Sequence, residues 1–434
     1  MSRSARSRVA LFLCYSLLGL SQVACGSGRQ GAGLVPGPPA TTDTTIIHTA
    51  SINPAIPAHV QDVSLWHQSG IANNIPVAWM ATWATWAMVG ASTYALQFHA
   101  AGGKHTIVFT DPQYYYVLPT WTSPGNYPES AFGHGSNGVR TQWDGLYGGI
   151  EYYLLPNSSA SQAGYAGVVK QETAGGGFDY VYADGVSDSL TTSLQGPRLP
   201  KPVEITTDAQ YVAGMKQLFT MSPLPILING YNNGNPVTEE EYVGSTNVAG
   251  VWGEECFSTP NRVQTNGYWQ EEENALLYTT THHVYAICGG RDALADTRPG
   301  RIYYLASWWL SYDPTYSVSF AEFASSGTIY LFPEQLIVPT RPDQVVTNIL
   351  SLRWYTGAYV RRFEECYYNQ VSWGRCAAVV NPSSLYSAAI PHLPVTYTHS
   401  LALDLNNLYN GGKASLSTSV PTTLAPGTGV ILFQ

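Results

Sequence analysis

The chain has 434 residues and a formal net charge of -9, and only 11% of its residues are charged. No cluster of Lys and Arg follows the first eight residues, which excludes the basic surface that nucleic-acid binding requires. Aromatic residues make up 12% of the chain, with 30 Tyr and 12 Trp. Few charges and many tyrosines fit an extracellular surface that meets neutral, hydroxyl-rich ligands.

The first 25 residues read as a targeting segment. MSRSARSR holds three arginines and no acid, and VALFLCYSLLGL follows as a short apolar run. Spanning a bilayer takes roughly 20 apolar residues, so this run predicts a secretory signal instead. SQVAC then resembles a bacterial lipoprotein cleavage site, although Gln22 stands where an apolar residue is usual. We expect an exported protein that lipid on Cys25 anchors to a membrane, with simple cleavage and release as the alternative.

After a flexible, Gly-, Pro- and Thr-rich linker over 26–55, short β-rich runs alternate with helical patterns. Each run holds Val, Ile, Tyr or Phe and is closed by Gly, Pro, Asn or Asp, as strands are. The predicted strands lie near 59–66, 105–112, 149–156, 178–185, 224–231, 247–255, 282–290 and 315–323. Helices are predicted over 83–101, 206–221, 269–281 and 300–312, the second with Thr207 or Asp208 as its N-cap.

Eight strands alternating with helices favour a parallel (β/α)8 TIM barrel over 56–345. A doubly wound open sheet is the alternative, but no GxGxxG turn follows the first strand. The segment 114–138 reads as a long loop, which is usually functional. Short alternating runs over 346–434 predict a small C-terminal antiparallel β-domain, resembling a β-sandwich.

Four cysteines follow Cys25, and in an exported protein they predict up to two disulfides with three connectivities. We favour Cys366–Cys376, which are close in sequence, and Cys256–Cys288 by elimination. No two of them form a CxxC pair, which argues against zinc. His282 and His283 alternate across a predicted strand and cannot both face one metal, so we expect no metal site and no cofactor.

Acids gather where the predicted strands end, which is where a barrel of this kind places its active site. Asp111 ends one strand, Asp184 another, and Glu254 and Glu255 a third. Cleavage of a glycosidic bond needs two carboxyl groups, one to protonate the leaving oxygen and one to attack or stabilise the anomeric carbon. The competing interpretation of Asp184–Gly185 is an ordinary turn, whose carboxylate accepts backbone N–H bonds.

Four segments together resemble the TIM-barrel glycoside hydrolases and their uncharacterised relatives. GGGFDYVYADGVSD (175–188) is similar to the fourth strand of that family, PILINGY (225–231) to the fifth and GVWGEECF (250–257) to the sixth. RRFEECYYNQVSWGRCAAVVNPSS (361–384) is similar to the start of its C-terminal β-domain. The chain departs from the pattern at Tyr180, where many relatives have Gly, so a bulkier barrel floor is expected.

The resemblance implies that Asp184 is the nucleophile or stabiliser and Glu254 the general acid/base. Glu255 is the rival for the second role, because a shift of one residue exchanges the two faces of a strand. Further candidates for contact with a carbohydrate substrate are Asp111, Asn229, Tyr231, Trp252, Trp66 and His67. The alternative function is a non-catalytic glycan-binding or structural surface lipoprotein on a degenerate barrel.

Overall fold

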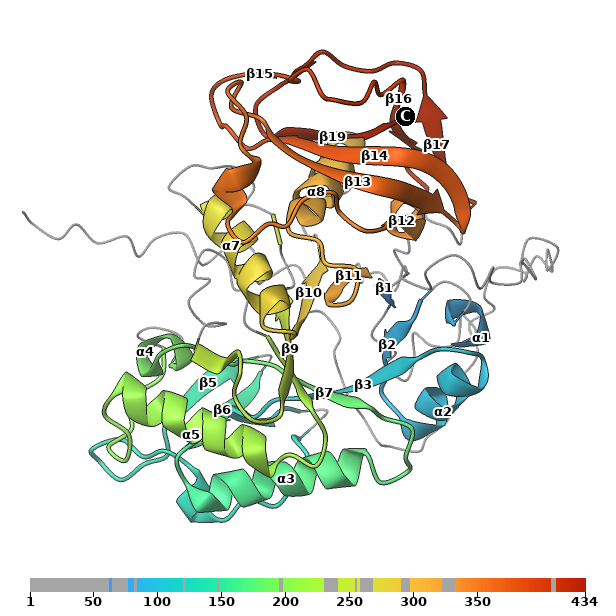
Figure 1. Cartoon of the computed structure of the whole chain (residues 1–434). Coiled ribbons are helices and arrows are strands. Elements are labelled where there is room, and N and C mark those ends of the chain that lie inside the picture. Colours follow the sequence, from blue (N-terminus) through green and yellow to red (C-terminus); the bar gives the residue numbers. More distant parts are fainter. Residues whose placement is uncertain are drawn as a thin grey trace, which may run out of the picture.

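The computed structural model describes residues 62–64, 77–81, 84–119, 122–146, 148–194, 198–229, 241–253, 256–257, 268–289, 297–321, 332–406 and 411–434. A curled parallel sheet lies at its centre, with antiparallel sheets at either end (Figure 1). Among the described residues, no helix combines the length and the apolar composition that crossing a membrane requires.

The strands of the parallel sheet follow one another in the hydrogen-bonded order β1-β11-β10-β9-β8-β7-β3-β2. Their bounds are β1 Asp62–Ser64, β2 Trp86–Met88, β3 His105–Thr110, β7 Tyr180–Ala183, β8 Ile226–Asn229, β9 Val248–Gly253, β10 Tyr285–Gly289 and β11 Ser317–Ala321. The order closes on itself where β1 meets β2, through the single residue pair Val63–Trp86. The predicted parallel α/β sheet is therefore confirmed, and its seam is narrow.

Bulky side chains fill the inside of the curled sheet. The buried cluster there consists of Trp86, Met88, Ile107, Tyr182, Leu227, Trp252, Ile287 and Val318. Tyr180 stacks on Trp86 with ring centroids 4.9 Å apart, so an aromatic pair stands at the amino ends of these strands. The interior is a packed core and not a channel, as in barrels of this size.

Helices cover the outside of the sheet. They are α1 Val77–Met80, α2 Ser92–Ala100, α3 Ser159–Glu172, α4 Leu190–Ser193, α5 Asp208–Met221, α7 Tyr268–Thr281 and α8 Arg298–Leu310. Thr207 caps α5 in a capping box with Gln210, which confirms one of the two predicted caps.

Four predictions differ from the observed structure. The predicted loop 114–138 begins with strand β4 (Tyr114–Val117) and holds the 3-10 turn η3 (Glu129–Ala131). The predicted strand 282–290 begins only at Tyr285, so His282 and His283 lie in the turn after α7 and not on a strand. The run 149–156 forms β6 (Gly149–Tyr153), which pairs with β4 (Tyr114–Val117) and β5 (Gln142–Leu146) in a separate antiparallel sheet. The predicted helix 83–101 instead begins with strand β2, and only its second half is helical. All three β2 residues are buried, so the strand shows no alternation of apolar and polar residues by which to recognise it.

The C-terminal sheet is antiparallel, in the order β12-β13-β14-β19-β16-β17. Its strands are β12 Ile337–Pro339, β13 Tyr359–Tyr368, β14 Val371–Asn381, β16 His399–Leu403, β17 Ala414–Ser417 and β19 Thr428–Phe433, with β15 Ala388–Ala389 and β18 Thr423–Leu424 in a small second sheet. Two 3-10 turns, η5 Pro333–Leu336 and η6 Ile349–Leu352, precede β12 and β13, and η3 Glu129–Ala131 lies between β4 and β5. The predicted antiparallel region is confirmed, and its first strand precedes residue 346.

Helix α8 joins the two halves. It lies between the parallel sheet and the C-terminal sheet in Figure 1, and Gly429 of β19 leaves no room for a side chain against Ala306. Arg301 of α8 forms a bidentate ion pair with Glu334, with both side chains at most 4% exposed. Removal of either partner would leave an uncompensated charge buried between α8 and the segment before β12.

Both expected disulfides are present. Cys256–Cys288 links the segment after β9 to β10, with Cα atoms 5.7 Å apart, and Cys366–Cys376 links β13 to β14 at 5.9 Å. Disulfides persist in oxidising compartments, so the two bonds are consistent with an exported protein.

Candidate active site

Polar side chains converge where three adjacent strands of the parallel sheet end. Asp111 follows β3, Asp184 follows β7, and Asn229 is the last residue of β8. The strand order places β7 between β3 and β8, so parallel pairing brings all three residues to one edge. Counted along the chain, β7 and β8 are the fourth and fifth strands of the parallel sheet, as the resemblance implies.

Asp184 is held by two N–H donors. The Asn229 side-chain amide donates to Asp184 Oδ1 at 2.8 Å, and the backbone N–H of Gly185 donates to the same oxygen at 2.8 Å. Gly185 has φ +69° and faces Asp111 Oδ1 and the ring of Tyr114, so neither the backbone nor the space favours a larger residue. Asp184 therefore accepts the backbone N–H bond expected of an ordinary turn residue, and it also accepts a side-chain hydrogen bond from the neighbouring strand β8.

Asp111 accepts three hydrogen bonds. The backbone N–H groups of Gln113 and Tyr114 donate to its Oδ1 at 2.9 Å each, and the Tyr116 hydroxyl donates to its Oδ2 at 2.9 Å. Tyr116 belongs to β4, the first strand of the separate antiparallel sheet that follows Asp111 in the chain. Its side chain extends back to the Asp111 carboxyl group. Both aspartates keep some access to solvent while protein surrounds them.

Burial and mutual repulsion raise the pKa of this pair. Burial raises the pKa of Asp111 well above its usual range, the negative charge of Asp184 raises it further, and the three hydrogen bonds oppose both effects. Burial also raises the pKa of Asp184, and the N–H groups of Asn229 and Gly185 oppose it. Because the two carboxyl groups interact, they do not ionise independently, and the pair takes up its second negative charge only at a pH above the usual range of an aspartate.

A buried hydrogen-bond network supports the segment that carries Asp111. Gln113 donates from its amide to the carbonyl oxygen of Ser193 at 2.7 Å and accepts from the Tyr211 hydroxyl. Tyr114 donates to the same carbonyl, and the Tyr153 hydroxyl lies 3.0 Å from Ser193 Oγ. A fully satisfied buried network of this kind is rigid, so Asp111 has a fixed position.

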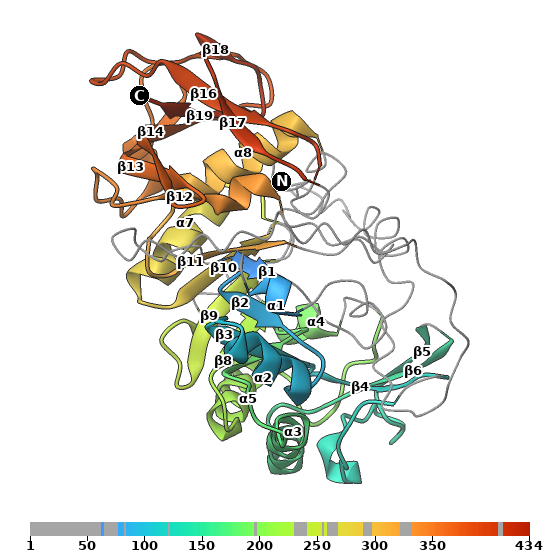
Figure 2. The ribbon, with the colours of Figure 1, turned by 90° about the vertical axis from the view of Figure 1, so that its right-hand side faces the viewer.

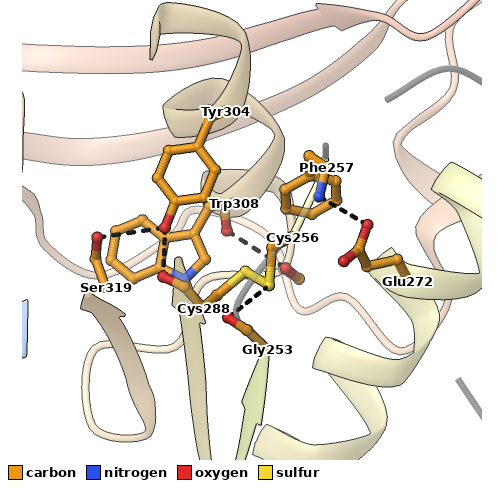
Figure 3. The surroundings of a disulfide bond; sticks show 9 residues. Gly253, Cys256, Phe257, Glu272, Cys288, Tyr304, Trp308 and Ser319 are labelled. Atoms are coloured by element: carbon orange, nitrogen blue, oxygen red, sulfur yellow. Dashed lines mark hydrogen bonds between the residues drawn. A yellow bond between two sulfur atoms is a disulfide. The ribbon is translucent and has the colours of Figure 1, made fainter. Parts of the chain in front are cut away.

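A disulfide links the ends of β9 and β10, and β9 is the neighbour of the strand β8 that carries Asn229. Cys256 is bonded to Cys288 of β10, and its backbone N–H donates to Gly289 O at 2.9 Å. Figure 3 shows the bond between Tyr304 and Trp308 of α8 on one side and Phe257 and Glu272 on the other. The Phe257 N–H donates to Glu272 Oε2 at 2.8 Å. The predicted acids Glu254 and Glu255 lie outside the described residues, between Gly253 and this anchored cysteine in the sequence.

The other predicted contacts divide into two groups. Trp252 of β9 is 3% exposed and packs edge-on against Tyr182 at 5.0 Å inside the curled sheet, which is the environment of a core residue. Tyr231, Trp66, His67 and the anchor candidate Cys25 lie outside the described residues. Of the predicted substrate contacts, the structure thus brings Asp111 and Asn229 to Asp184.

Sequence reasoning missed Tyr116 and Gln113. Both follow Asp111 closely, in the run DPQYYYV (111–117), but their role depends on how β4 folds back. Within the described ranges, no group of three or more His, Cys, Asp or Glu side chains is arranged to hold a metal ion.

No family model and no curated protein matches the chain. Solved structures similar to it include Ega3 of Aspergillus fumigatus in complex with galactosamine, at 14% identity over 60% of this chain and 88% of that one, with a TM-score of 0.37. An α-amylase from Geobacillus thermoleovorans complexed with acarbose has 10% identity over 82% and 89%, with a TM-score of 0.40. A xylosidase from Aspergillus niger has 10% identity over 86% and 64%, with a TM-score of 0.44.

The amylase and the xylosidase are glycoside hydrolases, and the identities and TM-scores of all three structures are low. Likeness at this level carries no argument about activity, which has to come from the side chains at the strand ends.

Proposed function

We propose that the protein is a glycoside hydrolase that acts on an extracellular or periplasmic glycan by two-carboxylate catalysis. The observation that supports the proposal is the convergence of Asp111, Asp184 and Asn229 at one edge of the parallel sheet, with an amide and a hydroxyl on the two carboxyl groups. Carboxyl groups with raised pKa values that gather at strand ends are typical of functional sites.

In this proposal Asp184 is the nucleophile or stabiliser. Its role needs an ionised carboxylate, and the donors from Asn229 and Gly185 favour that form. Asp111, protonated beside it, holds a sugar hydroxyl by hydrogen bonding and keeps a second negative charge away from Asp184. Asn229 orients the carboxylate through its amide group.

Glu254 is proposed as the general acid/base that protonates the leaving oxygen, with Glu255 as the rival. A separation of about 5 Å between this carboxyl and Asp184 would give retention of configuration, and about 6.5–9.5 Å would give inversion. The proposal also includes a complete (β/α)8 barrel, a domain boundary near residue 345, export, and a lipid anchor on Cys25.

The test is hydrolysis of a panel of aryl glycosides and cell-wall polysaccharides by the purified chain, beside Asp184→Asn and Glu254→Gln. We expect activity that falls at least about a hundredfold in both variants, since general acid–base groups contribute about 10²–10⁴-fold. Glu364→Gln is the matched control, because Glu364 forms an exposed ion pair with Arg341 on the C-terminal sheet.

The outcomes separate the alternatives. Activity that survives both substitutions would mean that other acids carry the reaction. Binding of a glycan with no hydrolysis by the parent would favour the non-catalytic glycan-binding protein instead.

A further inference from the structure

A groove of about 1010 Å³ opens on the C-terminal part of the chain, away from the acids described above. Its lining comes from two segments, 350–357 before β13 and 381–388 after β14. The second segment leads into β15, which stands at the top of Figure 1, while β5 and β6 lie in the lower half of that view. Figure 2 likewise shows β18, which pairs with β15, at the top and β4, β5 and β6 in the lower half. The groove is therefore a separate feature of the fold.

Large apolar side chains at this groove are unusually exposed. Tyr355 is 87% exposed, and Tyr386 and Leu385 are each 74% exposed. Tyr355 comes from one wall and Tyr386 from the other. Exposed aromatic side chains gathered on the two segments that line one groove are typical of a binding site, whereas scattered exposed residues need no explanation.

The wall that carries Tyr386 is rigid. Asn381 is 2% exposed, and its amide donates to the carbonyl oxygens of Tyr386, Leu424 and Ala425 at 2.9, 3.1 and 3.0 Å. Ser383 Oγ accepts the backbone N–H of Tyr386 at 2.9 Å. The exposure of Tyr386 is thus imposed by a hydrogen-bonded loop and does not come from fraying.

The wall that carries Tyr355 is also a fixed turn. The Trp354 N–H donates to Ala358 O at 2.8 Å, and the Gly357 N–H donates to Trp354 O at 2.9 Å. Gly357 has φ +87°, which only glycine adopts without strain. Trp354 packs against the buried cluster of the C-terminal sheet, so the base of the turn is anchored while Tyr355 projects.

Polar groups complete the lining. Ser384 and Ser387 are exposed and supply hydroxyl groups, and exposed Arg353 supplies N–H donors. Among the described residues that line the groove, none is Asp or Glu. Rings that stack on the apolar faces of sugars, together with hydroxyl and guanidinium groups that bond their oxygens, are the chemistry that recognises a glycan.

We propose that this groove is a second glycan-binding site, for a neutral polysaccharide chain. A membrane surface is the other class of partner that exposed Tyr and Leu fit. The groove is concave and its described lining holds one cation, Arg353, whereas attraction to an anionic membrane uses clusters of Lys and Arg around a protruding apolar face. Two fixed aromatic walls need little ordering when a polymer binds, and this favours affinity.

The test is affinity electrophoresis of the full chain in native gels with starch, xylan, galactomannan or β-glucan. All proteins carry Asp184→Asn, which stops hydrolysis if the proposed function holds and leaves the groove intact if it does not. The test variant is Tyr355→Ala combined with Tyr386→Ala. Val371→Ala is the matched control, because Val371 is 63% exposed on the β13–β14 hairpin outside the groove. Thermal melting checks that each variant is folded.

We expect at least one polysaccharide to retard the parent and the Val371→Ala control equally. The double variant should bind at least about tenfold more weakly, the loss expected for removal of aromatic anchors. Free migration of the parent in all four gels would overturn the proposal, as would equal retardation of a folded double variant. Loss of binding to phosphatidylglycerol vesicles in the double variant, with no glycan bound by the parent, would assign the groove to a membrane.

Discussion

Asn229→Ala tests the proposed division of roles between the two aspartates. The Asn229 amide lies 2.8 Å from Asp184 Oδ1 and is 9% exposed, so the hydrogen bond is short and nearly dry. A hydrogen bond to a charged group contributes about 1.5–3 kcal/mol, and one pKa unit corresponds to about 1.4 kcal/mol. The bond stabilises the ionised form, so its loss raises the pKa of Asp184 by about 1–2 units. Water can enter the space left by the Asn229 side chain and donate a hydrogen bond to Asp184 in its place. We therefore expect a rise in the pKa of Asp184 near the lower end of this range.

The assay is the pH dependence of kcat/KM, which reports the pKa values of the free enzyme. Because the proposed nucleophile must be ionised, activity is lost as the pH falls through its pKa. We therefore expect the acidic limb of the Asn229→Ala profile to move to higher pH by about 1 unit, while activity on the alkaline side of that limb is better retained.

Tyr116→Phe is the matched control, since it removes a 2.9 Å hydrogen bond from the other carboxyl group. It raises the pKa of Asp111, which holds its proton to higher pH and places no added charge beside Asp184. The acidic limb should then stay in place or move to lower pH. An unmoved limb in an active Asn229→Ala enzyme, or the same upward shift in both variants, would refute the assignment of Asp184 as the ionised residue.

Three further predictions concern the Arg301–Glu334 ion pair, the Cys256–Cys288 disulfide and the proposed lipid anchor on Cys25. Glu334→Gln leaves Arg301 charged and 3% exposed, and should lower the free energy of unfolding in urea by about 3–5 kcal/mol; a loss below about 1 kcal/mol would show that the pair adds little. Replacing Cys256 and Cys288 by Ser opens a link across a sequence separation of 32 and should cost about 3–4 kcal/mol in the same measurement; an unchanged midpoint would mean that hydrogen bonds alone hold the segment after β9. Cells fed a radioactive fatty acid should label the parent and not Cys25→Ala, and an unlabelled parent would contradict the anchor.

Local features of this chain could be predicted from the sequence. Thr207 is visible as a cap because its hydroxyl acts within one turn of α5. Asp111 and Asp184 are visible as strand ends, because β-rich runs stop at turn residues. Their meeting at one edge then follows from parallel pairing, which sets all carboxyl ends on the same side.

Pairing partners could not be predicted in the same way. The run GIEYY (149–153) has the composition of a strand whether it joins the parallel sheet or β4 and β5. Trp86–Met88 is buried on both faces and too short to show a period. The predicted barrel thus counted one strand that belongs elsewhere and omitted one that belongs to it. For the same reason Tyr116 was missed, since its contact with Asp111 exists only once β4 is placed.

The missed strand β4 also explains why two similar aspartates have different roles in the proposal. Both follow strands of the parallel sheet, so their sequence contexts alone would make them equivalent. The segment after β3, which includes β4, buries the carboxyl group of Asp111 and so raises its pKa. The neighbouring negative charge of Asp184 raises this pKa further. Asp184 accepts a hydrogen bond from Asn229 at the end of β8, and the proposal therefore makes it the ionised group. A change that opens the β4–β6 sheet should therefore bring the two pKa values together, because solvent would screen the repulsion that separates them.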